Sequence, residues 1–149
     1  MSCIFCKILN NELSSSRVLE DEGTVAILDI HPVSEGHTLI LPRRHVESFT
    51  DLSPDEAAAL IASGQLIAAQ LKRTLEGCEG VNLSLADGAS AGQEVPHVHL
   101  HIIPRRAGDG FGWKFPPNYS SEPVARDRLD DVASRLKQAL EGASKKTAT

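Results

Sequence analysis

The chain has 149 residues, of which 41% are hydrophobic and 23% charged, and its formal net charge is −5. This length fits one domain, and the composition excludes collagen-like, coiled-coil and wholly disordered chains. No apolar run reaches the ~18 residues that a membrane helix needs, and we expect no secretory signal because the first residues lack a basic region followed by an apolar one. The acidic charge argues against general nucleic-acid binding, and an odd cysteine count favours a reducing compartment. We therefore expect a cytoplasmic protein that binds neither nucleic acid nor membranes.

Three short strands are predicted in the first part of the chain. Residues 17–20 form the first, the apolar and β-branched residues 24–30 the second, and residues 38–41 the third. The turn-forming pairs His31-Pro32 and Glu35-Gly36 separate the last two. Such runs between turn residues are typical of an antiparallel sheet.

The clearest helix signal follows these strands. Ser53 is suited to cap a helix, Pro54 to occupy its first position, and Glu56 to complete a capping box three residues after the cap. Apolar residues then recur at helical spacing over 57–75, and Gly77 supplies a stop signal. The sequence predicts one long amphipathic helix here.

A second strand-rich region follows the long helix. Residues 81–85 are predicted as a strand, residues 87–93 as a loop of small residues, and residues 97–103 as a last strand that Pro104 ends. Proline commonly ends strands because it has no N–H to donate to the ladder.

The C-terminal part is predicted to be a helix, because apolar residues recur at helical spacing over 129–140. Residues 142–149 are small and polar, and we expect them to form a disordered tail. Strands grouped around one long helix favour an α+β fold with a mainly antiparallel sheet. We expect a single domain over residues 1–141.

The segment 97–103 carries three of the six histidines of the chain at alternate positions. Alternate side chains of a strand share a face, so three imidazoles line one face and three apolar side chains pack from the other. One histidine alone is usually structural, whereas half of them on one strand face predicts a functional site. The two sets are His97, His99 and His101 on one face, and Val98, Leu100 and Ile102 on the other.

One interpretation of the three histidines is a metal site, to which Cys3-x-x-Cys6 would add a second pair of ligands. Residues His97 and His101 would have Cα atoms about 13 Å apart in a strand. Because Zn–N bonds are only about 2.0–2.1 Å long, the three rings cannot comfortably bind one ion. At least one histidine must therefore have another role.

The other interpretation is nucleophilic catalysis by the central His99. Crowding by neighbouring imidazoles lowers a histidine pKa, which leaves a neutral ring with a lone pair near pH 7. Its second ring nitrogen must donate a hydrogen bond, for which a backbone carbonyl is a suitable acceptor. The flanking histidines can be protonated, and in that form they stabilise charge on a phosphoryl group.

The segment 97–103 resembles the His-φ-His-φ-His-φ-φ pattern (φ apolar) of the histidine triad (HIT) family. Three other segments match that family in order and spacing, and together they extend over residues 3–105. The match is most similar to bacterial-type HIT proteins, and it implies a HIT-like α+β domain that forms a homodimer through strands joined across the interface. The three segments are Cys3-Ile4-Phe5-Cys6-Lys7-Ile8, the run from Gly36 to His45, and Ala91-Gly92-Gln93.

The activity implied by the resemblance is hydrolysis of nucleoside phosphoramidates or dinucleoside polyphosphates, with a purine nucleotide as substrate. His99 matches the nucleophile of the family, which forms a nucleotidyl-histidine intermediate that water cleaves. His101 and His37 match residues around the phosphate. Asp29, with Ile30 beside it, matches the position that holds the ribose and the base.

The zinc-containing branch of the family implies a metal site of four residues. The resemblance implies that Cys3, Cys6, His45 and His97 form a closed Cys₂His₂ site, and a site with four protein ligands is structural because a catalytic zinc keeps one position open. The alternative for the two cysteines is a redox pair or two ordinary thiols.

Three positions leave details of the chemistry open. Gln93 is expected either to bond a phosphate oxygen or to brace the loop that precedes the histidines. Ala86 and Glu94 stand where many family members have polar side chains, and a carboxylate at position 94 would repel phosphate. The remaining alternatives are a zinc hydrolase with a metal-bound water, a nucleotide-binding or partner-docking module with little turnover, and a nucleotidyl-transferase or phosphorylase.

Overall fold

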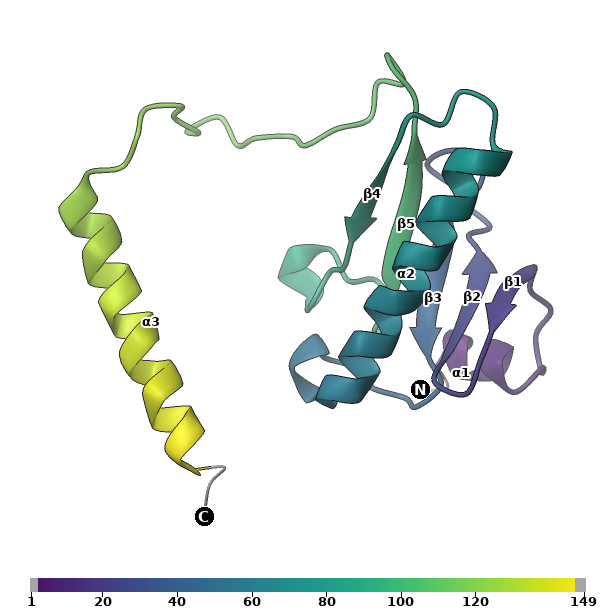
Figure 1. The fold of residues 1–149 in the computed structure, drawn as a ribbon, viewed down its shortest axis with the longest axis horizontal. Helices are drawn as coiled ribbons and strands as arrows, with labels where there is room; N and C mark the ends of the chain where they lie inside the picture. Colours follow the sequence, from purple (N-terminus) through teal and green to yellow (C-terminus); the bar gives the residue numbers. More distant parts are fainter. Residues whose placement is uncertain (1–2, 147–149) are drawn as a thin grey trace. The chain divides into compact units, whose positions relative to one another are not determined.

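The computed structural model describes residues 3–146, which divide into one compact unit ending at Phe111 and another beginning at Gly112. The first unit contains a five-stranded antiparallel sheet, and the second contains a long helix (Figure 1). The predicted α+β class is confirmed. The elements are α1 (Ile4–Leu9), β1 (Arg17–Glu20), β2 (Thr24–Leu28), β3 (Thr38–Pro42), α2 (Pro54–Thr74), β4 (Gly80–Ser84), β5 (Leu100–Arg105) and α3 (Arg126–Lys146), with short 3₁₀ turns at Phe49–Asp51 and Ala89–Ala91.

The sheet order is β1-β2-β3-β5-β4, so the last strand lies between β3 and β4. In the β3–β5 pairing, Leu39 is opposite His101 and Thr38 is opposite Ile102. His37 directly precedes β3, and this register therefore brings it close to His101. Two histidines far apart in sequence meet because of strand order alone.

The long helix α2 lies across one face of the sheet (Figure 1). The predicted capping box is present: the Glu56 N–H donates to Ser53 Oγ, and the Ser53 N–H donates to the Glu56 carboxylate. The helix approaches the sheet closely at Gly64, where an added Cβ would lie 3.2 Å from a methyl of Leu100. The core between them contains Ala26, Ile40, Leu60, Ile67, Leu71, Val98, Leu100 and Ile102.

The opposite face of the sheet is covered by the short helix α1. Phe5 and Ile8 of α1 pack on the other set of alternating strand residues, which are Val25, Ile27, Leu39 and Leu41. This helix has no counterpart among the predicted elements. Six residues are too few to show a helical period, and its N-cap, Cys3, makes no side-chain capping bond.

The last strand differs from its predicted bounds of 97–103. It begins at Leu100, and it continues through Pro104 to Arg105. Pro104 is tolerated because β3 pairs with β5 only as far as Ile102, beyond which β5 pairs with β4 alone. The alternation of faces is nevertheless as predicted, since Val98 packs in the α2 core.

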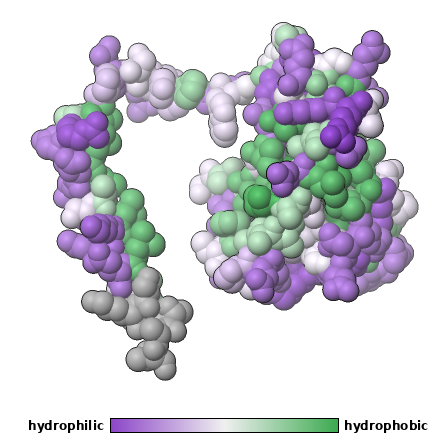
Figure 2. All heavy atoms as spheres, viewed as in Figure 1, coloured by the Kyte–Doolittle hydropathy of each residue, from purple (hydrophilic) through white to green (hydrophobic). Residues whose placement is uncertain are grey.

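The second unit contains α3, which confirms the predicted C-terminal helix. Its apolar side chains lie along one side of the helix in Figure 2, and they are Leu129, Val132, Leu136 and Leu140. The helix includes residues 142–146 of the segment expected to be disordered, while 147–149 lie outside the described residues. Across residues 3–146, neither long helix carries an apolar stretch sufficient to cross a bilayer. The extent of a single domain over 1–141 stays a prediction.

Candidate active site and metal centre

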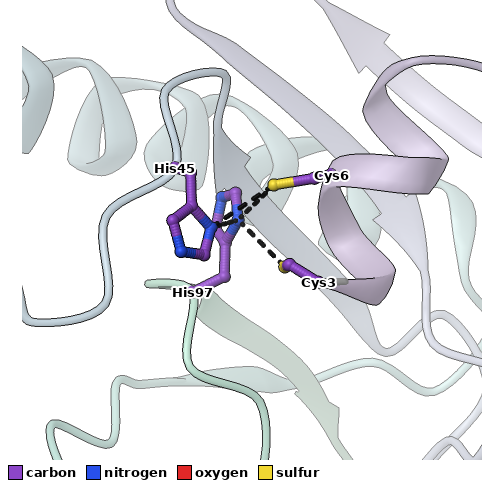
Figure 3. A group of neighbouring side chains, drawn as sticks. All are labelled: Cys3, Cys6, His45 and His97. Carbon is purple, nitrogen blue, oxygen red and sulfur yellow. Dashed lines mark hydrogen bonds between the residues drawn. The ribbon is translucent and has the colours of Figure 1, made fainter. Parts of the chain in front are cut away.

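Four side chains from distant parts of the sequence converge at the N-terminal end of α1, and they are Cys3, Cys6, His45 and His97 (Figure 3). The Nδ1 atom of His97 lies 3.5 Å from Cys3 Sγ and 3.7 Å from Cys6 Sγ. The Nδ1 atom of His45 lies 3.3 Å from Cys6 Sγ and 3.3 Å from Nδ1 of His97. These are the four residues for which the sequence resemblance implied a shared site.

The spacing of the four donor atoms fits a tetrahedral metal ion. Bonds of about 2.05 Å to nitrogen and about 2.3 Å to sulfur, at tetrahedral angles, place two nitrogens about 3.3 Å apart and a nitrogen and a sulfur about 3.5 Å apart. The observed separations agree with both values. Two imidazole nitrogens beside the thiols favour a metal centre over a redox pair of cysteines.

The surroundings of the cluster orient its ligand atoms. The buried ring of His97 donates its Nε2–H to the carbonyl oxygen of Pro42 at 3.0 Å, which leaves the lone pair of Nδ1 for the cluster. Nε2 of His45 lies 3.6 Å from the Glu47 carboxylate. Burial lowers the pKa of His97, and burial together with Cys3 raises the pKa of the Cys6 thiol. Since thiolates are the ligand form, a bound cation is what would hold Cys6 deprotonated near neutral pH.

His99 is separated from this cluster and faces a different environment. Its Nδ1–H donates to the backbone carbonyl of His97 at 2.7 Å, which is the tautomer-fixing bond predicted from the sequence. Because a carbonyl only accepts, the proton of the neutral ring lies on Nδ1, and Nε2 keeps a lone pair. The ring is mostly buried, yet His99 lines a cavity of about 550 Å³.

This cavity brings together most of the residues expected to bind a nucleotide. Asp29, Ile30, His37, His99 and His101 all line it, together with apolar side chains of α1. Ile30 is 84% exposed at its edge. A cavity of this size is typical of small-molecule sites, which usually have apolar walls and a few polar groups.

His37 and His101 form a hydrogen-bonded pair beside His99. The N–H of Val33 donates to Nδ1 of His37 at 3.2 Å, so a neutral His37 carries its proton on Nε2. That Nε2–H donates to Nδ1 of His101 at 2.9 Å, which places the proton of a neutral His101 on Nε2. The Asp29 carboxylate lies 3.5 Å from Nδ1 of His37, farther from this nitrogen than the Val33 N–H group is.

Both rings of this pair favour the neutral form. Burial lowers the pKa of His37, although Asp29 opposes the shift. Burial, followed by the nearby His99 and His37, lowers the pKa of His101 to about 4. A protonated flank is therefore disfavoured at His101, because its ring is partly buried and lies beside two other imidazoles.

Asp29, His37 and His101 also lie close enough to be considered as metal ligands. The ring of His37, however, uses opposite nitrogens toward the other two residues: Nδ1 faces Asp29 and Nε2 bonds His101. One ion cannot take the place of both contacts without breaking the bond between the histidines. The arrangement favours a hydrogen-bond relay over a metal-bound water.

Gln93 lies in the loop before the histidines, and both ends of its side-chain amide have backbone partners, one in this loop and one in the loop that contains Glu47. Its Oε1 accepts from the Gly88 N–H, and its Nε2 donates to the carbonyl oxygen of Glu47, each at 2.8 Å. Of the two expected roles, this geometry favours bracing the loop over binding phosphate. Its neighbour Glu94 does line the cavity.

Several contacts of the site were not foreseen from the sequence. The backbone partners at Val33 and Pro42 carry no side-chain signal and depend only on strand placement. Phe5 lies edge-on to His99, with ring centroids 5.1 Å apart. Its position inside the matched segment that begins at Cys3 was the available signal.

Comparison with known proteins agrees with this geometry. The family model described as HIT domain matches residues 10–108. The chain is 46% identical over 135 residues to an uncharacterised HIT-like protein of Methanocaldococcus jannaschii, which covers 91% of this chain and 98% of that protein. It is 34% identical over 146 residues to an adenosine 5'-monophosphoramidase of Candida albicans, covering 93% and 91%. A crystal structure of a zinc-bound histidine triad family protein from Mycobacterium smegmatis superimposes with a TM-score of 0.72 at 40% identity, over 79% of this chain and 85% of that one.

The family match spans most of the sheet, and both sequence relatives cover nearly the whole chain. It includes His37, His45 and the three alternate histidines that the structure gathers around one cavity and one Cys/His cluster. The chain therefore belongs to the histidine triad (HIT) family.

Proposed function

We propose that this protein hydrolyses nucleoside phosphoramidates or dinucleoside polyphosphates of purine nucleotides through a nucleotidyl-histidine intermediate on His99. The observation that carries this proposal is the hydrogen bond from Nδ1–H of His99 to the His97 carbonyl. It leaves Nε2 as the unprotonated nitrogen of a residue that lines the cavity. The similarity to an adenosine 5'-monophosphoramidase supports the same reaction class.

In the first half of the reaction, the Nε2 lone pair attacks the α-phosphorus and forms a P–N bond. The bond from phosphorus to the leaving group breaks, and the leaving group departs with its electron pair and takes a proton from solvent. The Nε2–H of His101 donates a hydrogen bond to a phosphoryl oxygen as charge develops there. The bond from His37 fixes His101 in the tautomer that can do so.

In the second half, water attacks the same phosphorus and the P–N bond to His99 breaks. The electron pair returns to Nε2, and the proton lost by the water returns to solvent, so no net proton is gained by the protein. Splitting one displacement into two steps is the usual advantage of a covalent intermediate. Throughout the cycle His37 and His101 stay neutral donors.

Asp29 and Ile30 are proposed to hold the nucleoside. The carboxylate of Asp29 is oriented by the His31 N–H, which donates to its Oδ1 at 2.8 Å, and its oxygens can accept from ribose hydroxyls. Ile30 and the apolar side chains of α1 offer a surface for a base. Polar groups at one end and apolar walls at the other suit a nucleotide.

We further propose that Cys3, Cys6, His45 and His97 hold a zinc ion. Four protein ligands leave no open position, so the ion stabilises the fold and takes no part in the chemical steps. The tetrahedral spacing of the donor atoms supports this, as does the zinc-bound relative of M. smegmatis. A cytoplasmic, reducing location would keep both thiols available for the metal.

A second candidate function is a nucleotide-binding module with little turnover. The observation that favours it is that Glu94, an acidic residue, lines the cavity in which an anionic substrate would bind. A nucleotidyl-transferase would use the same residues with a different acceptor in the second half-reaction. The homodimer expected from the family resemblance stays a prediction.

The test compares the natural protein with His99→Ala on an AMP-amine phosphoramidate. We expect turnover to fall by more than about a thousandfold, because the nucleophile is lost. Glu22→Ala, a control at an exposed residue outside the cavity lining, is expected to retain most of the activity. Undiminished turnover in His99→Ala would rule out the proposal. AMP binding by calorimetry with no product over hours in the natural protein would favour the binding module.

A further inference from the structure

The short helix α1 belongs to both the Cys/His cluster and the cavity. Its cysteines, Cys3 at the N-cap and Cys6 one turn later, contribute to the cluster (Figure 3). The residues between and after them, Ile4, Phe5 and Ile8, line the cavity. This six-residue helix and its N-cap therefore form a wall of the proposed nucleotide site and supply two of the four proposed metal ligands.

Phe5 connects the two sites directly. Its ring lies edge-on to the metal-cluster residue His97, with centroids 5.9 Å apart and an interplanar angle of 89°. The same ring lies 5.1 Å from that of His99 at 63°. Phe5 is 7% exposed and packs against β2 and β3, so its position is set by how α1 rests on the sheet.

The helix needs anchoring at both ends. Isolated helices shorter than about 12–15 residues are marginal in water, and α1 has six. At its C-terminal end, Arg17 Nη2 donates to the carbonyl oxygen of Ile8 at 2.8 Å. At its N-terminal end, Cys3 makes no side-chain capping bond, and the cysteines face His45 and His97 instead.

We propose that metal binding at the Cys/His cluster and nucleotide binding in the cavity are coupled through α1, so that each raises the affinity for the other. This inference rests on the proposed nucleotide site and on the proposed metal site. A bound ion fixes Cys3 and Cys6, and thereby holds Phe5 and Ile8 in the cavity wall and the ring of His99 in place. Removal of the ion frees the N-terminal end of α1, and the wall loosens.

The experiment measures AMP affinity by calorimetry in zinc-loaded and chelator-treated protein, both with thiols kept reduced. We expect AMP to bind at least about fivefold more tightly to the zinc-loaded form, within the usual range of such couplings. Zinc affinity, measured by competition with a chromophoric chelator, must then rise by the same factor when AMP is present, because coupling is reciprocal. Hydrogen exchange supplies an independent readout: chelation is expected to speed exchange in α1 and to leave β2 and β3 unchanged.

Three variants separate coupling from general damage. Cys6→Ser is expected to lose zinc and to weaken AMP binding to the level of the chelated protein. Cys78→Ser, which removes the cysteine outside the cluster, is expected to change neither affinity. Phe5→Leu keeps all four ligands, and it should preserve zinc affinity while reducing both AMP affinity and the dependence of that affinity on zinc.

Equal AMP affinity with and without zinc, within about twofold, would overturn the coupling, as would failure to bind one zinc per chain. If circular dichroism shows that the chelated protein unfolds, the test is made with zinc-loaded Phe5→Leu instead. The inference is refuted if this variant has the same AMP affinity as the zinc-loaded natural protein and if AMP raises its zinc affinity by the same factor. If an adduct forms on His99 while AMP affinity ignores zinc, the coupling fails and the proposed reaction stands. Absence of AMP binding in both states would refute both.

Discussion

Acid pH is expected to destabilise the fold through His101, and His101→Gln tests this directly. Burial and the neighbouring His99 and His37 lower the pKa of His101 from 6.5 to about 4. An unfolded chain binds a proton at this residue below pH 6.5, whereas the folded protein does not until the pH nears 4. The contribution of His101 to folding stability is therefore fully present above pH 6.5, and it is lost as the pH falls from 6.5 to about 4.

The magnitude follows from the size of the pKa shift. Each pKa unit corresponds to 1.36 kcal/mol, so the shift sets an upper bound of about 3 kcal/mol. Because the ring is only partly buried, solvent screening reduces the expected loss to about 1.5 kcal/mol between pH 7 and pH 4.5. Glutamine at this position can still accept from His37, and it does not titrate.

Urea unfolding of the natural protein and of His101→Gln at both pH values is the assay. Both proteins carry the same Cys/His cluster, so any loss of metal at low pH cancels in the difference between them. The variant is expected to lose about 1.5 kcal/mol less on acidification. An equal loss in both proteins would refute the reasoning that His101 is held neutral by its surroundings.

Three further predictions concern the cavity, the cluster and the long helix. Glu94→Gln is expected to raise kcat/KM on a phosphoramidate about threefold at low salt, because it removes a negative charge that repels the substrate. Glu22→Gln is the control with the same net charge, at an exposed residue outside the cavity lining. No gain of Glu94→Gln over that control would contradict a phosphate site beside Glu94. Cys6→Ser should lower the Tm by at least about 5 °C in calorimetry, against less than about 2 °C for Cys78→Ser, and equal shifts would argue against a structural metal. Ser53→Ala should cost about 1 kcal/mol in urea unfolding through loss of the capping box, and no cost would show that the cap contributes nothing.

The parts of the fold that local chemistry determines were predictable from the sequence. The capping residues before α2 and the alternation that places Val98 with the α2 core and His99 on the cavity side are both properties of a few neighbouring residues. The short α1 was missed because its stability comes from burying Phe5 and from contacts at its ends, which no local pattern records.

The contacts that were not predicted depend on pairing between strands and loops that are distant in the sequence. The insertion of β5 beside β3 brings His37 to His101, and no spacing in the sequence encodes that strand order. Burial and the neighbouring imidazoles favour the neutral form of His101, which the sequence pattern left open. Gln93 shows the same limit, because its bond to the Glu47 carbonyl exists only once the two loops are adjacent.

Mass spectrometry of the protein quenched during turnover of an AMP-amine phosphoramidate tests the central claim most directly. A mass increase of one adenylyl group per chain, mapped by peptide fragmentation to His99 and absent from His99→Ala, is the predicted result. An adduct located on any other residue, or steady product formation without any adduct on rapid acid-free quenching, would contradict nucleophilic attack by this ring.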